Sequence, residues 1–169
     1  MSIAVPLDEL LDYSDHEREK WERWLMADGT RTHLRLQGAG RLPTVADLLD
    51  HVFLVERRHL ARLDGGTPPD STGVPSGNIP ALFEYARLVR ADFRCYVADA
   101  NERVAAEAID ITLRNGESFR MPKRQLAVHI VLHEVRHFAQ LALAARLAGI
   151  EPPGDHDLFY FRPVNAGPA

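Results

Sequence analysis

The stretch PKRQLAVHIVLHEVRHFAQLALAARLA, residues 122–148, decides how this chain folds. Pro122 suits the first position of a helix, because its ring fixes a helical φ and its missing N–H needs no partner there. Gly149 suits the position just beyond the end of a helix, where a left-handed backbone conformation is common. We therefore predict one long helix from Lys123 to Ala148.

This helix carries three histidines at intervals of four residues, His129, His133 and His137. Each interval advances about 400° around an α-helix, so the three rings project from one stripe about 80° wide. Two histidines at positions i and i+4 can bind one metal ion between them. Because two ligands on one helix rarely hold an ion alone, we expect a third ligand from another helix.

A second helix offers that ligand. It reads LLDHVFLVERRHLARL over residues 48–63, with Pro43 and Thr44 as a start signal, Asp47 in a capping-box-like position and Asp64-Gly65-Gly66 as its end. His51 lies within its apolar part, and a buried imidazole without a partner costs about 1–3 kcal/mol. Metal ligation would meet that need. A hydrogen bond to backbone or water would also meet it, and is the more usual role of a single core histidine.

Two further helices are expected outside this pair. The first runs from about Leu7 to Ala27, with a break near Ser14 as an alternative, and Asp28-Gly29 ends it. A loop rich in Pro, Gly, Ser and Thr follows the second helix from Gly65 to Asn78. The next helix starts near Pro80 and, on its apolar period, runs past Val104.

The hydrophobic period then changes from helical to alternating. Residues 109–121 predict a two-stranded ribbon, and Asn115-Gly116 between its strands favours a type I′ turn. Together these elements predict an all-α protein in the main, a four-helix bundle with a short two-stranded β ribbon before the last helix. A chain of 169 residues suits one such domain, residues 1–169.

Composition excludes several classes of function. The net charge of −4 and the pI near 6.0 favour neither nucleic acid nor an anionic membrane as partner. No apolar run is long enough for a transmembrane helix, and the acidic N-terminus is unlike a signal peptide. The single cysteine, Cys95, cannot form an internal disulfide, so we expect a cytoplasmic protein with an inert buried thiol in the third helix.

The remaining polar and aromatic residues have mainly structural interpretations. Glu56 and Glu134 are candidates for a general base or for a group that orients a ligand, although each is more often a surface charge. The other expectations are these: Trp21 and Trp24 anchor the core, residues 16–20 form a solvated helix face, His16, His33 and His156 lie at the surface, His59 is structural or exposed, and Leu158, Phe159, Tyr160 and Phe161 fold back onto the body.

The residues from His133 to His137 also match the His-Glu-x-x-His motif of zinc proteases, in which the Glu is the general base. In those enzymes a third ligand usually follows downstream, and only His156 follows here, after Pro152-Pro153. A helical bundle rather than a mixed sheet precedes the motif. We therefore disfavour a protease.

With the helix that carries His51, the later segment LAVHIVLHEVRHFAQLALAARLAGIEPPGDHDLFYF resembles the DinB/YfiT-like superfamily over nearly the whole chain. That resemblance implies a four-helix bundle whose metal ligands are His51, His133 and His137. His129 matches a position that is often His in the family but is not usually a ligand. The family often reads His-Arg-Gly-Gln where this chain has His137-Phe138-Ala139-Gln140, so Gln140 is retained.

Relatives in this superfamily include thiol S-transferases, thiol-dependent isomerases and hydrolases. A three-histidine site leaves ligand positions open for substrate, as catalytic ions require, and imidazole suits both Zn and Ni. We therefore expect a metal-dependent enzyme that activates a thiol or water, with a small-molecule substrate such as a low-molecular-weight thiol. The alternatives are a non-catalytic, stress-related protein that binds a metal or ligand, and a metal-free bundle that forms a homodimer through the apolar sides of its first and last long helices.

Overall fold

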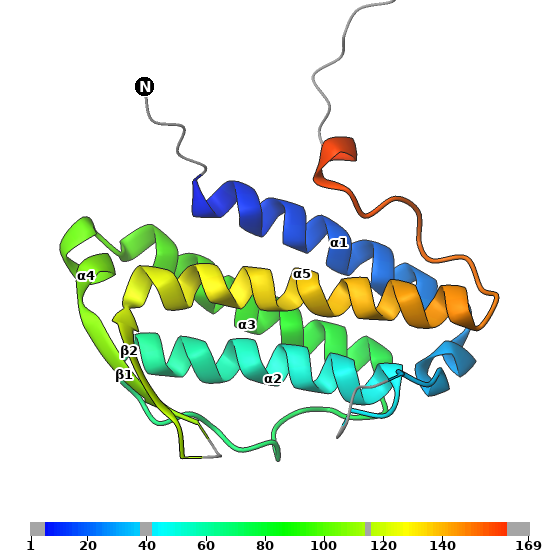
Figure 1. Cartoon of the computed structure of the whole chain (residues 1–169), viewed down its shortest axis with the longest axis horizontal. Coiled ribbons are helices and arrows are strands. Elements are labelled where there is room, and N and C mark those ends of the chain that lie inside the picture. Colours follow the sequence, from blue (N-terminus) through cyan, green and yellow to red (C-terminus); the bar gives the residue numbers. More distant parts are fainter. Residues whose placement is uncertain (1–5, 38–41, 114–115, 162–169) are drawn as a thin grey trace, which may run out of the picture.

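Four long helices surround a shared core in the computed structural model, which describes residues 6–37, 42–113 and 116–161 (Figure 1). Helix α1 spans Leu7–Ala27, α2 Val45–Leu63, α3 Ile79–Asp99 and α5 Lys123–Leu147. Helix α1 packs against α3 and α5, and α2 packs against the same two. The four therefore form a closed bundle, as predicted.

Smaller elements connect the long helices. They are the 3-10 turn η1 (Gly29–His33), the short helix α4 (Glu102–Ala106), the strands β1 (Ala108–Thr112) and β2 (Ser118–Pro122), and the 3-10 turn η2 (Leu158–Tyr160). Strands β1 and β2 pair antiparallel, with Ile111 opposite Phe119, which confirms the predicted ribbon. The turn predicted at Asn115-Gly116 cannot be assigned a type, since residue 115 lies outside the described residues.

The helix ends follow the local signals closely. Thr44 and Asp47 form a complete capping box at the start of α2, with each side chain bonded to the other residue's backbone N–H. Gly149 has φ +73°, the left-handed conformation expected just beyond α5. Pro122 itself is the N-cap residue with ψ 145°, so α5 begins at Lys123 and the N1 assignment was off by one position.

Three predictions about the first and third long helices need correction or refinement. Helix α1 is continuous through Ser14. Helix α3 ends at Asp99 instead of running past Val104, because Ala100 is extended and the Asn101 side chain caps a new helix, α4, at the Val104 N–H. Cys95 is exposed, not buried, because it lies off the apolar stripe of α3.

The core consists of two apolar clusters, one toward each end of the bundle. Trp21, Phe53 and Phe83 belong to one cluster, and Leu60, Phe93 and Ile130 belong to the other. Trp21 and Trp24 are both buried, as predicted. A buried polar layer, described below, lies near the middle of each long helix. No helix in the described part of the chain has the length and apolar character needed to cross a bilayer.

The C-terminal segment after α5 turns back along α1 (Figure 1). The indole N–H of Trp24 donates to the Glu151 carbonyl at 2.7 Å, and Lys20 donates to the Asp155 carbonyl. Phe161 packs edge-on against Tyr13. The predicted return of this segment is thus confirmed for Phe161, whereas Leu158 and Phe159 are exposed.

Candidate metal centre

Three histidines that are far apart in the sequence meet between α2 and α5. His51 Nε2 lies 3.2 Å from His133 Nε2, and His137 Nε2 lies 3.1 Å from the same atom. One nitrogen from each ring lies within 4.8 Å of the other two. His133 and His137 are buried and His51 is partly buried, so the three nitrogens share a sheltered space at the seam of the two helices.

The spacing of these nitrogens suits a shared ion. Imidazole nitrogens bind zinc at about 2.0–2.1 Å, so two of them on one ion are about 2.9–3.4 Å apart at octahedral to tetrahedral angles. Without an ion, His133 Nε2 faces two other ring nitrogens. A ring nitrogen can either donate one hydrogen bond or accept one through its lone pair. Hydrogen bonds among the three rings therefore leave at least one of these nitrogens without a partner.

Burial keeps these three rings neutral, the form that binds metal. Burial, then the neighbouring His137 and Arg58, lowers the pKa of His51 to about 4. Burial, then His137 and His51, lowers the pKa of His133 to about 2. For His137, burial lowers the pKa although its bond to Gln140 opposes the shift.

The side chain of Gln140 orients one ring of the triad. Its Oε1 lies 2.6 Å from His137 Nδ1, and because a carboxamide oxygen only accepts, Nδ1 carries the proton. His137 Nε2 then presents its lone pair toward the triad. Such hydrogen bonds behind a ligand are the usual way in which proteins fix the tautomer of a metal-binding histidine.

His129 and His59 extend the row of imidazoles away from the triad. The His129 ring centroid is 5.6 Å from that of His133 and 5.3 Å from that of His59. Neither joins the group of nitrogens that could share an ion among the described residues. His59 is buried, which fits the structural half of its prediction.

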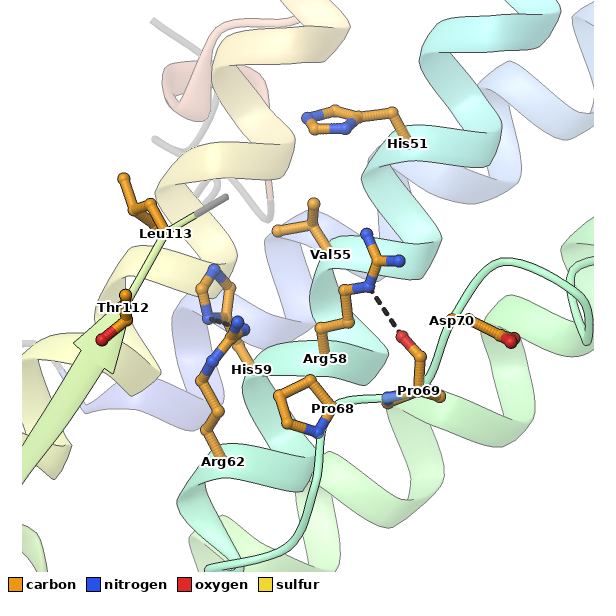
Figure 2. Close-up of a pocket in the computed structure, with 10 residues that line it drawn as sticks. All are labelled: His51, Val55, Arg58, His59, Arg62, Pro68, Pro69, Asp70, Thr112 and Leu113. Atoms are coloured by element: carbon orange, nitrogen blue, oxygen red, sulfur yellow. Dashed lines mark hydrogen bonds between the residues drawn. The ribbon is translucent and has the colours of Figure 1, made fainter. Parts of the chain in front are cut away.

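A pocket of about 520 Å³ lies beside the triad and has His51 in its wall (Figure 2). The α2 side chains Val55, Arg58, His59 and Arg62 continue that wall. The loop after α2 and the end of strand β1 complete it with Pro68, Pro69, Asp70, Thr112 and Leu113. The pocket therefore joins the candidate metal centre to two arginines.

Glu134 is neither a surface charge nor a base at this site. Its carboxylate accepts hydrogen bonds from Ser14, from Arg18 and, at 2.6 Å, from Arg90. Burial alone would raise the pKa of Glu134, but Arg18 and Arg90 outweigh it and hold the pKa below its usual value. Because Glu134 points into the bundle, the His-Glu-x-x-His motif lacks the general base that a zinc protease needs.

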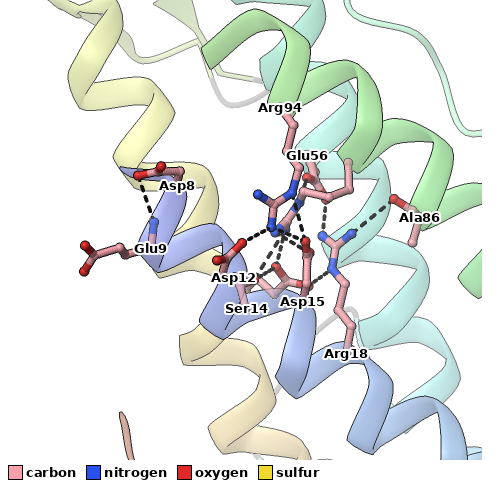
Figure 3. A network of polar contacts seen from close by, with 11 residues as sticks. Asp8, Glu9, Asp12, Ser14, Asp15, Arg18, Glu56, Ala86 and Arg94 are labelled. Carbon is pink, nitrogen blue, oxygen red and sulfur yellow. Dashed lines mark hydrogen bonds and ion pairs between the residues drawn. The ribbon is translucent and has the colours of Figure 1, made fainter. Parts of the chain in front are cut away.

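Glu56 has the same role from α2. Its carboxylate accepts from Arg18 and, at 2.7 Å, from Arg90, and it is also buried. Figure 3 shows how α1, α2 and α3 converge on this network, with Arg94 joining Asp12 and Asp15 at its edge. Both glutamates were thus wrongly expected at the surface, and the network explains why: two arginines compensate their buried charges.

Of the other predictions about polar residues, one is confirmed and two are wrong. His16 and His33 are exposed, as expected. Glu17 and Arg18 are buried, so residues 16–20 are not simply a solvated face. His156 is not a surface residue, because its ring stacks on Trp21 at 5.0 Å and its Nδ1 contacts Glu17 at 2.5 Å.

Sequence reasoning overlooked Arg58 and Arg62 as parts of the site. The signal was present, since both lie seven and eleven residues after His51 and so share its side of an α-helix. Arg18 and Arg90 were also overlooked, and no local pattern marks them because their partners come from other helices.

Comparison with known proteins identifies the family of this chain. The sequence profile of the DinB family matches residues 1–164. No curated relative matches the chain. The chain belongs to the DinB family.

Proposed function

We propose that His51, His133 and His137 bind one divalent metal ion, Zn or Ni, and that the protein is a metal-dependent enzyme acting on a small molecule. The convergence of three Nε2 atoms, two pairs of them 3.1–3.2 Å apart, carries this proposal. When bound, such an ion lowers the pKa of a thiol or a water molecule and so supplies a nucleophile near neutral pH.

The chain's own residues support this chemistry in three ways. The low pKa values of His51 and His133 keep both rings neutral at neutral pH, so each ring has one nitrogen with a free lone pair. Gln140 holds His137 in the orientation that ligation requires. Three protein ligands leave coordination positions open, as catalytic sites do, and the adjoining pocket gives a small molecule access to His51.

Transfer of a low-molecular-weight thiol is the favoured reaction, with hydrolysis second. For hydrolysis, a carboxylate base beside the triad would be an advantage, and both candidates, Glu56 and Glu134, are held in ion pairs inside the bundle. Thiol transfer would make no such demand on the protein, because an ion held by His51, His133 and His137 would itself lower the pKa of the thiol.

Metal content tests the site directly. Elemental analysis of the purified protein, and of protein reconstituted with Zn or Ni, is expected to give one ion per chain. H133A is expected to lose the ion, whereas H129A, one turn earlier on the same helix, keeps it. A stoichiometric ion in H133A contradicts the ligand assignment.

Activity is tested separately. Conjugation of low-molecular-weight thiols to electrophiles is measured before and after chelation, and again after the metal is restored. We expect activity to disappear and return with the metal. Activity that survives complete removal of the metal contradicts the mechanism, and a bound ion without turnover favours a non-catalytic binding protein.

A further inference from the structure

One face of α2 connects the candidate metal centre to a pair of arginines. Relative to His51, an α-helix places Arg58 about 20° to one side and Arg62 about 20° to the other. Both side chains line the same pocket as His51. Seven residues of helix advance by about 10 Å, so the Cα of Arg58 lies about 10 Å along α2 from that of His51. A small molecule can span this distance.

The surroundings hold both guanidinium groups at the pocket wall. Arg58 Nε donates to the Pro69 carbonyl at 2.8 Å, which ties the side chain to the loop after α2 (Figure 2). Arg62 Nη1 lies 3.3 Å from His59 Nδ1 and can only donate to it, so the other nitrogen of His59 carries a proton. The wall thus offers fixed N–H donors.

The charge of this wall is positive. Its one acidic side chain is Asp70, which is exposed and accepts hydrogen bonds from the backbone and hydroxyl of Thr72. No carboxylate in the described part of the chain forms an ion pair with Arg62. Burial and then the charge of Arg58 lower the pKa of Arg62, so the two like charges are close enough to repel each other. An anion between them would reverse that repulsion.

We propose that Arg58 and Arg62 form a subsite for an oxyanion, the carboxylate or phosphate group of a substrate whose reacting atom lies at the histidine triad. Guanidinium groups suit this task because their planar donors match the two oxygens of such groups. The proposal rests on the proposed function for the role of the triad. It adds the class of substrate: an acidic small molecule, whether the thiol or the electrophile.

Binding of simple anions tests the subsite without knowledge of the substrate. Succinate and inorganic phosphate are titrated calorimetrically into the full chain at low ionic strength, with the metal chelated so that neither anion can bind to it. We expect binding of at least one of them in the millimolar range or tighter. R62Q is expected to weaken that binding by about tenfold or more, the effect of losing a charged hydrogen bond.

R57Q is the matched control, because Arg57 belongs to the same helix but pairs with Asp92 on α3, outside the pocket. We expect it to bind the anion as the wild type does. R62K keeps the charge but loses the planar donors, and an intermediate loss of affinity is expected. Because R62K preserves the charge and the stem of the side chain, it also serves as the test if R62Q does not fold.

The outcomes separate this proposal from the metal site. The proposal is overturned if neither anion binds, or if R62Q and R62K both bind as tightly as R57Q. Preference for succinate or phosphate identifies the group that the subsite recognises. A chain that binds the anion through Arg62 but retains no metal would contradict the proposed function alone, and a chain that retains metal but binds neither anion would contradict the subsite alone.

Discussion

Gln140 controls which nitrogen of His137 faces the other two histidines. Its Oε1 accepts the Nδ1 proton at 2.6 Å. In Q140L this proton loses its partner and the ring can adopt the other tautomer, so we expect metal affinity to fall by about 10–100-fold. Competition with a chromophoric chelator measures the change. Q140E keeps an acceptor and is expected to bind at least as tightly as the wild type, and equal affinity in Q140L would refute the orienting role.

His59 gives a pH dependence that is separate from metal ligation. Burial, then Arg62, lowers its pKa to about 3 from the ordinary value of 6.5. Below about pH 6.5, His59 is therefore protonated in the unfolded chain but not in the folded chain. As the pH is lowered, the free energy of unfolding then decreases by up to about 1.4 kcal/mol per pH unit for such a group. We expect H59N to flatten this slope between about pH 6.5 and 5.

Urea unfolding at a series of pH values, with chelator present, measures that slope. H33N replaces an exposed histidine and is expected to keep the full slope of the wild type. Other buried histidines, His133 among them, contribute to the slope as well. The prediction therefore concerns the difference between H59N and H33N, and identical slopes in the two variants would disprove it.

At the scale of the helices, the ion pairs near their midpoints hold the bundle in register. Arg18 comes from α1, Glu56 from α2, Arg90 from α3 and Glu134 from α5. Each charge is stable in the core only while its partners are present. The network therefore ties all four helices to one relative position, and it fixes the turn of α5 that carries His133.

Removing one charge from this layer leaves the others without compensation. We expect E134Q to lower the free energy of unfolding by about 3–5 kcal/mol, the usual effect of breaking a buried pair. E19Q is the control, because Glu19 pairs with Arg23 at the surface, where such pairs contribute at most about 1 kcal/mol. Urea unfolding at neutral pH compares the two, and similar losses in both would show that the layer is not a stabilising unit.

His156 is one of the residues that hold the C-terminal segment to α1. Its ring stacks on Trp21 and contacts Glu17, and burial of the Glu17 carboxyl is offset by His156 and Lys20, which hold its pKa below the usual value. H156A removes the stack and one partner of a buried carboxylate. We expect it to lower stability by about 1–3 kcal/mol and to change tryptophan fluorescence. Thermal unfolding against H33A checks this, and an unchanged midpoint would contradict it.

Local signals predicted most of the elements, since caps, turns and hydrophobic period depend on near neighbours in the chain. Thr44 and Asp47 marked α2, and Gly149 marked the end of α5. The break after Asp99 was missed because the apolar period continues across it, while the cap at Asn101 is a single polar side chain. A period reports which face is buried but is insensitive to a short interruption.

The site was predictable in outline from the residues alone. Spacing put His129, His133 and His137 on one stripe of a helix, and the apolar surroundings of His51 marked it as a third ligand. Choosing His133 and His137 over His129 needed the resemblance to a family, because the spacing of the three is uniform. The buried Glu56 and Glu134 could not be recognised, because their burial depends on arginines of α1 and α3. Charged residues are usually solvated, so a sequence that buries them gives a misleading signal until the tertiary partners are known.

For the molecule as a whole, the triad acts as a link between two distant parts of the chain. His51 and His133 are 82 positions apart, yet their nitrogens lie 3.2 Å from each other across the α2–α5 seam. An ion bound to both helices stabilises the folded chain over the unfolded one, in which the ligands are far apart. Metal binding should therefore be visible as added stability even where no substrate is known.

We expect a metal concentration of about 100 times the dissociation constant to add about 2.7 kcal/mol to the free energy of unfolding. For a domain of this size that raises the thermal midpoint by about 5–10 °C. H51A and H133A, one on each side of the seam, should both lose this increase, because two ligands on α5, or one from each helix, hold the ion poorly. H129A should keep it. Hydrogen exchange adds a spatial test: protection on metal addition should rise in both α2 and α5, and a rise confined to α5 would mean that His51 does not take part.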